Sequence, residues 1–147
     1  MPVQGTHFFG PSGFYNGVTT KSLRFDDGGS PELSKTWASN ETDSNHFTVS
    51  FWVKRCTVSS GIHTMLQCDT AGGQTTTINF QADDTMYVGL AHSGTGQRRM
   101  LTNQVFRDVS TWYHILLAYD SENATNNLKA RLYVNGTEVT DFGTDER

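Results

Sequence analysis

The side chains that could do chemistry in this sequence are its carboxylates, imidazoles and thiols. A retaining glycosidase needs two carboxyl groups about 5 Å apart, one acting as acid and the other as nucleophile. None of the five glutamates is followed by an aspartate two positions later and then by a second glutamate. The G-x-S-x-G nucleophile turn, the H-E-x-x-H zinc helix and the Walker phosphate loop are also absent from the sequence. We therefore predict that the protein is not an enzyme and has no catalytic residues.

Two loops contain the hard oxygen ligands that Ca²⁺ prefers. Asp83 and Asp84 share one loop, and Asp120, Asn123 and Asn126 share another. The alternative is that these residues only shape turns, because Asp and Asn tolerate left-handed backbone and cap turns with their side chains. We predict no obligatory cofactor, with calcium as the one ion that these loops could bind.

The remaining reactive side chains favour structural roles. His114 is expected in a core strand, where a hydrogen-bonded core histidine is a more common outcome than a catalytic base. Cys56 and Cys68 could form a disulfide only if their Cα atoms came within about 7 Å of each other. The sequence shows no export signal, so we favour two reduced, half-buried thiols.

Two tryptophans are candidates for binding a glycan. A carbohydrate site needs an exposed aromatic ring to stack on the sugar and polar groups to bind its hydroxyls. Trp52 is expected on a polar face beside Thr48 and Ser50, and Trp37 precedes a polar loop. For Trp52 the alternative is burial under a covering loop, because large aromatic side chains usually bury most of their area.

The N-terminal segment is rich in aromatic residues but shows no alternation. Phe8, Phe9, Phe14 and Tyr15 lie among four glycines and one proline over residues 5–17. Such an arm could insert its rings into a partner, or it could fold back over an open sheet face or edge. We predict an arm over residues 1–17 and one folded domain over residues 18–147.

The rest of the chain alternates apolar and polar residues with a period of two, which is typical of β-strands. Turn signals separate about nine or ten short strands at the spacing of a sandwich or barrel. Residues 112–120 are apolar on both faces, which favours a central strand covered on both sides. Asn135-Gly136 is a strong signal for a type I′ hairpin turn. The expected strands lie near residues 21–25, 32–35, 47–55, 63–68, 76–81, 86–92, 100–103, 112–120, 128–135 and 137–142.

Composition and charge exclude several other classes of protein. The sequence contains 14 Gly, 20 Thr and 17 aromatic residues, which argues against a helical bundle. The net charge of −4 gives no basic footprint for nucleic acid or an anionic membrane. The longest apolar run, residues 115–119, is far shorter than the roughly 20 residues of a spanning helix, so we predict no membrane insertion.

Four segments together resemble a known family. They read S-L-R-F-D at 22–26, F-T-V-S-F-W-V-K at 47–54, W-Y-H at 112–114 and L-Y-V-N-G at 132–136. In this order they resemble the concanavalin A-like jelly roll of the laminin-G and pentraxin type, over roughly residues 21–142. The resemblance implies an all-β, antiparallel β-sandwich, with its final strands absent from this sequence.

Residues 106–114 more narrowly resemble structural proteins of marine tailed phages, including tail fibres and capsid-associated proteins. This resemblance implies a non-enzymatic virion protein on the outer surface of a capsid or tail. Its partners would be other virion proteins or copies of itself, and a cell-surface glycan would be a further partner. The alternative is a carbohydrate-binding module, since one fold can have many functions.

Overall fold

The computed structural model describes residues 32–36, 45–69, 75–90 and 98–147. The chain divides into two units, residues 1–40 and 41–147. In the first unit, residues 32–36 form neither helix nor strand, so the strand predicted over residues 32–35 is wrong. The predicted strand over residues 21–25 and the aromatic arm, with Phe8, Phe9, Phe14 and Tyr15, lie outside the described residues, and the boundary of the arm stays a prediction.

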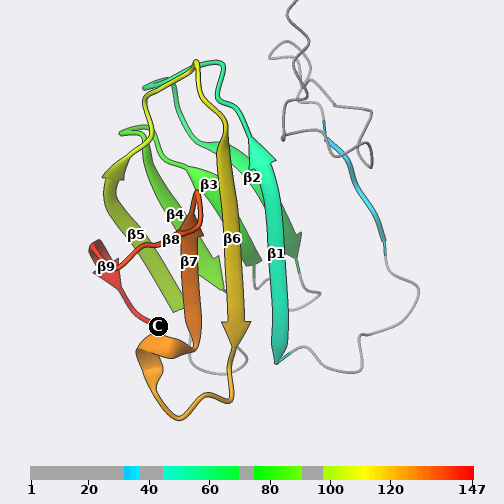
Figure 1. Cartoon of the computed structure of the whole chain (residues 1–147). Coiled ribbons are helices and arrows are strands. Elements are labelled where there is room, and N and C mark those ends of the chain that lie inside the picture. The colour runs from blue at the N-terminus through cyan, green and yellow to red at the C-terminus, as the bar shows by residue number, and fades with distance from the viewer. Residues whose placement is uncertain (1–31, 37–44, 70–74, 91–97) are drawn as a thin grey trace, which may run out of the picture. The chain divides into compact units, whose positions relative to one another are not determined.

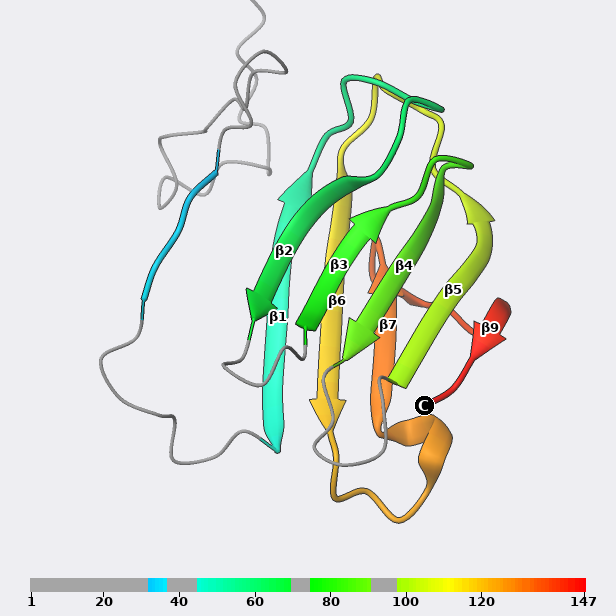
Figure 2. The same cartoon turned by 180° about the vertical axis from the view of Figure 1, so that it is seen from behind.

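The second unit consists of two stacked antiparallel sheets (Figures 1 and 2), which confirms the predicted all-β sandwich. The four-stranded sheet has the order β1-β6-β7-β8, and the five-stranded sheet has the order β2-β3-β4-β5-β9. The first comprises β1 (His46–Val53), β6 (Tyr113–Asp120), β7 (Ala130–Val134) and β8 (Thr137–Glu138). The second comprises β2 (His63–Asp69), β3 (Thr75–Phe80), β4 (Thr85–Leu90), β5 (Arg98–Val105) and β9 (Phe142–Asp145). The short 3₁₀ helix η1 (Asn126–Leu128) precedes β7.

Alternating apolar residues from both sheets form the core between them. In the four-stranded sheet, Ile115, Leu117 and Leu132 are at most 1% exposed. The five-stranded sheet and the segment after it add further buried side chains, among them Ile78, Phe80, Met86, Val88, Leu90, Met100 and Phe106. The apolar side chains of the two-residue period predicted from the sequence therefore point into the core.

Strand β6 differs from the prediction on its second face. One face of β6 is buried and consists of Tyr113, Ile115, Leu117 and Tyr119. The other face is only half-buried and consists of His114, Leu116, Ala118 and Asp120. That face points away from the five-stranded sheet, and we call it the outer face. The prediction of a central strand covered on both sides is therefore wrong for the outer face, and His114 is not a core histidine.

Two tight turns join neighbouring strands of the sheets. Gln81 N–H donates to the Thr85 carbonyl oxygen at 2.8 Å and closes a loop of three residues. The third loop residue, Asp84, has a φ of 71°, which is the left-handed conformation of this hairpin type. Asn135 and Gly136 both have positive φ and join β7 to β8, so the predicted Asn-Gly hairpin is confirmed.

The last residues cross from one sheet to the other. The single strand predicted over residues 137–142 is two strands, because β8 pairs with β7 whereas β9 pairs with β5. In the register of the second pair, Met100 lies opposite Asp145. Among the described residues, no helix has the length and hydropathy needed to cross a membrane.

A buried ionic cluster lies at one end of the sandwich. The Asp84 carboxylate is completely buried and accepts hydrogen bonds from the Ser59 backbone N–H and hydroxyl at 2.7 and 2.8 Å. Arg55 Nη2 lies 3.0 Å from one carboxylate oxygen, and Arg107 Nε donates to the other at 2.9 Å. Arg55 also donates to the Phe106 carbonyl oxygen, and its guanidinium lies 4.5 Å from the centre of the Phe80 ring.

The cluster lowers the pKa of the Asp84 carboxyl. The Ser59 backbone hydrogen bond is the largest cause, and the Ser59 hydroxyl and the two arginines add to it, whereas burial acts in the opposite direction. Because the pKa is lower in the folded chain, the stabilisation is complete above the unfolded carboxyl value of about 3.9. It is lost as the pH falls from that value toward the folded pKa.

We expect Asp84→Asn to lower the Tm at pH 7 by several degrees, because two arginines lose the carboxylate that neutralises them. The Tm of the natural chain should also fall as the pH drops below about 4, and that of the variant should fall less over the same range. Melts followed by circular dichroism at a series of pH values test both statements. Equal Tm values for the two chains at pH 7 would contradict the role given to Asp84.

Candidate functional site

Trp52 and His114 form an aromatic pair on the outer face of the four-stranded sheet. They are direct partners in the β1–β6 register, and their ring centroids lie 4.9 Å apart with an interplanar angle of 37°. The Trp52 side chain remains 51% exposed. His114 Nε2 lies 2.8 Å from the Ser50 hydroxyl, which fixes the imidazole beside the indole. Trp52 is therefore presented at the surface rather than buried under a loop.

Trp112 extends this aromatic surface along the chain. It precedes β6 by one residue and is 40% exposed, while its neighbour Tyr113 points into the core. Tyr113 and His114 begin β6 on opposite faces, so an extension of the strand by one residue puts Trp112 on the side of His114. It follows directly beyond the last pair of the β1–β6 register, Val53 with Tyr113. We call Trp52, Trp112 and His114 the tryptophan patch.

Away from the tryptophan patch, the side chains on the outer face are smaller and some of them are polar. Ser50 lies opposite Leu116, and Thr48 lies opposite Ala118. The side chains of this stretch are small or lie half-buried against the sheet. On the next strand, Arg131 pairs in register with Ala118, and its guanidinium lies 5.9 Å from the centre of the Tyr133 ring.

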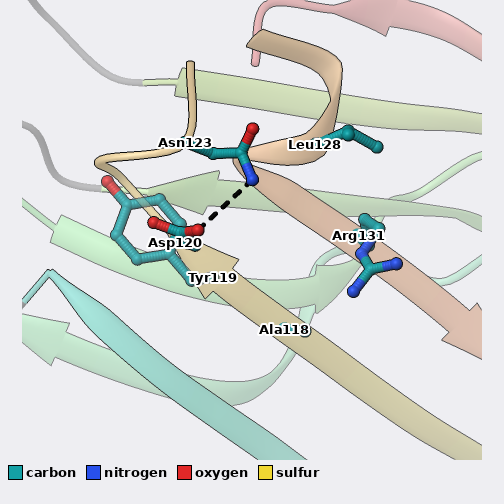
Figure 3. A pocket seen from close by; sticks show the side chains of 6 residues that line it. All are labelled: Ala118, Tyr119, Asp120, Asn123, Leu128 and Arg131. Carbon is teal, nitrogen blue, oxygen red and sulfur yellow. Dashed lines mark hydrogen bonds between the residues drawn. The ribbon is translucent and has the colours of Figure 1, made fainter. Parts of the chain in front are cut away.

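A pocket of about 190 Å³ lies at the far end of β6 and β7 (Figure 3). It is lined by Ala118, Tyr119, Asp120, Asn123, Leu128 and Arg131. Asn123 Nδ2 donates to Asp120 Oδ2 at 3.3 Å, and the two side chains point toward each other in Figure 3. His46 Nε2 lies 3.1 Å from the other oxygen of Asp120. The pocket therefore combines a carboxylate, an amide and a guanidinium with the apolar side chains of Ala118 and Leu128 and the ring of Tyr119.

A second, larger hollow of about 510 Å³ lies beside the β7–β8 hairpin. Its lining contains no aromatic ring and no cation, so it offers neither a stacking surface nor a charged donor to a ligand. The residues around it are Gln104, Val134, Asn135, Thr137, Glu138, Val139, Thr140 and Asp141.

The structure separates the candidate calcium ligands into two groups. Asp84 is enclosed by Ser59 and two arginines, so its charge is already balanced within the fold. The Asp83 carboxylate accepts from the Thr85 hydroxyl and backbone N–H, which lower the pKa of Asp83. Both act as turn residues here. Asp120 and Asn123 do meet in the pocket, but no group of three or more His, Cys, Asp or Glu that could hold a metal occurs among the described residues.

The other sequence candidates have simpler outcomes. Cys56 and Cys68 are both free and both exposed, so the expectation of half-buried thiols is wrong, whereas that of reduced thiols agrees with the structure. Trp37 lies outside the described residues. The sequence did not single out Trp112 or Arg131 for binding, although Trp112 shares the alternation of His114 along residues 112–120.

A family model described as the concanavalin A-like lectin/glucanases superfamily, of the laminin-G type, matches residues 27–146. No curated protein and no solved structure matches the chain in the corresponding comparisons. The matched segment includes every strand that the structure describes, and the two antiparallel sheets agree with this fold. The chain therefore belongs to the concanavalin A-like lectin/glucanases superfamily.

Proposed function

We propose that this chain is a non-catalytic carbohydrate-binding module whose sugar stacks on the tryptophan patch. The observation that supports this proposal most directly is the pair of half-exposed tryptophans beside His114 on one sheet face. A pyranose ring has an apolar C–H face and a rim of hydroxyls. A flat aromatic surface with polar groups at its edge complements both.

His114 supplies the polar partner within the patch. Its Nε2 shares a hydrogen bond with Ser50, whose hydroxyl can donate or accept. In the part of the chain that the structure describes, Nδ1 of this ring has no hydrogen-bond partner, so it can bind a sugar hydroxyl. The imidazole can donate or accept at Nδ1 because the Ser50 hydroxyl adapts to either tautomer.

Along strand β6, the tryptophan patch lies far from the Asp120 carboxylate. On strand β6 the nearest carboxylate is Asp120, six positions beyond His114. At the rise of about 3.4 Å per residue in a strand, this is a separation of about 20 Å. A sugar stacked on the patch is therefore far from Asp120.

We expect Trp52→Ala and Trp112→Ala each to weaken glycan binding by roughly tenfold or more, equivalent to about 1.4 kcal/mol. The physical reason is the loss of the apolar stacking surface. A glycan array identifies the ligand, and titration calorimetry with the best glycan measures the affinity of each variant. Reducing-sugar release from the same glycan should stay at background.

Ile62→Ala is the matched control, because Ile62 is 62% exposed in the loop between β1 and β2 and lies outside the patch. It should bind as the natural chain does, and all three variants should keep the natural Tm. The proposal would be refuted if the natural chain bound no glycan on the array. It would also be refuted if both tryptophan variants kept the full affinity.

A role as a virion component on the outer surface of a capsid or tail is our second candidate function. It is favoured by partly exposed apolar side chains at one side of the sandwich. Phe47, Phe51 and Val53 of β1 point inward but are only partly buried, as are Met65 and Leu66 of β2. Strands β1 and β2 are the outermost strands of the two described sheets and lie on the same side (Figures 1 and 2). A neighbouring copy or another virion protein could cover this apolar surface.

This second candidate predicts that the purified chain forms a defined oligomer, because association removes the apolar β1–β2 side from water. Sedimentation velocity over a concentration series tests it. The expected result is a discrete species heavier than the monomer, whose share rises with concentration. A single monomeric species at every concentration would argue against self-association, and failure to bind any phage particle would argue against the virion role as a whole.

A further inference from the structure

The pocket at the end of β6 and β7 has a charged side chain that the fold does not neutralise. The Arg131 guanidinium is exposed and contacts the Tyr133 ring, and among the described residues it has no carboxylate partner. Its neighbours in the pocket are the Asp120 carboxylate and the Asn123 amide. A guanidinium offers up to five N–H donors, and a carboxylate offers acceptors only. Donor and acceptor groups therefore face one small space of about 190 Å³.

The pocket and the tryptophan patch share the outer face of a single sheet. His114 and Asp120 lie at opposite ends of β6 and point to the same side, because they are an even number of residues apart. Arg131 joins this face through its register with Ala118. The two sites are consequently about 20 Å apart along one rigid strand.

The surface between the two sites is free of large projecting side chains on β1 and β6. Ser50 and Leu116 form one row across these strands, and Thr48 and Ala118 form the next. Leu116 and Ala118 are half-buried, so they add little height above the sheet. An extended ligand could lie along this row with one end on the tryptophans and the other in the pocket.

We propose that the outer face binds a linear oligosaccharide, with one sugar stacked on the tryptophan patch and a distant sugar of the same chain in the Asp120–Asn123–Arg131 pocket. This inference rests on the proposed function and adds the ligand class, an extended chain rather than a single terminal sugar. Neighbouring hydroxyls of a sugar suit the pocket, since one can donate to Asp120 while the next accepts from Arg131 or Asn123. Leu128 gives an apolar contact for the ring.

Affinity should then depend on chain length. Two sites on one rigid face act on the same ligand only when it is long enough to reach both, and the second contact then becomes intramolecular. We expect a hexasaccharide to bind roughly tenfold more tightly than the disaccharide of the same series, equivalent to about 1.4 kcal/mol. Cello-, malto- and manno-oligosaccharides of increasing length, measured by calorimetry on the full chain, provide the series.

Two substitutions separate the sites. Arg131→Ala should remove most of the length dependence and leave the affinity for the disaccharide unchanged. Trp52→Ala should weaken the binding of every length. Lys129→Ala is the matched control, because it removes a neighbouring cation that does not line the pocket, and it should keep the full length dependence.

The outcomes distinguish this inference from the proposed function. Equal affinity for short and long chains, or an unchanged length dependence in Arg131→Ala, overturns the extended site and leaves the tryptophan patch as a single-sugar site. Binding of no oligosaccharide in any series overturns both. The two-site face is established if the affinity rises tenfold from the disaccharide to the hexasaccharide and only Arg131→Ala removes this rise.

Discussion

The buried carboxylate of Asp84 is the interaction on which the rest of this sandwich depends. It joins the loop between β3 and β4 to Arg55, which follows β1, and to Arg107, which follows β5. The Phe106 backbone N–H closes the same region by donating to the Asp84 carbonyl oxygen at 2.9 Å. The Asp84 side chain therefore links the end of β1 in the four-stranded sheet to the β3–β4 hairpin of the five-stranded sheet. It also holds the segment that leads from β5 to β6.

This link determines where β1 ends relative to the core, and thereby what the outer face presents. Arg55 lies only three residues after Trp52. Anchoring Arg55 therefore restrains the last residues of β1. Strand pairing then sets Trp52 opposite His114 and Ser50 opposite Leu116. The hydrogen bond between Ser50 and His114 fixes the imidazole, which in turn packs against the indole. The Trp52–His114 pair is thus a consequence of register, whereas Trp112 comes from the segment before β6.

The sequence predicted the features that depend on neighbouring residues. Alternation over residues 76–81 and 86–92 predicted two strands, each with one apolar face, and β3 and β4 lie there. The Asn135-Gly136 pair fixed a turn with positive φ. These signals are local, because side-chain period and turn conformation depend on a few adjacent residues.

The sequence could not predict the features that depend on distant partners. Asp84 resembled a calcium ligand because a carboxylate looks the same whether its partner is a metal ion or an arginine, and Arg55 lies far from it in the chain. Residues 112–120 resembled a strand covered on both sides because apolar residues occupy both faces. The partial exposure of His114, Leu116 and Ala118 in the folded chain shows that one of those faces is a surface.

The most direct test of the central claim is an NMR titration of the three tryptophan indole N–H signals with a hexasaccharide that the array identifies. The account predicts that the signals of Trp52 and Trp112 shift together and saturate at the same ligand concentration. It also predicts that the backbone amide of Ile62 stays in place. A shift of Trp37 alone, or saturation with the Trp52 and Trp112 signals unmoved, would contradict binding at the tryptophan patch.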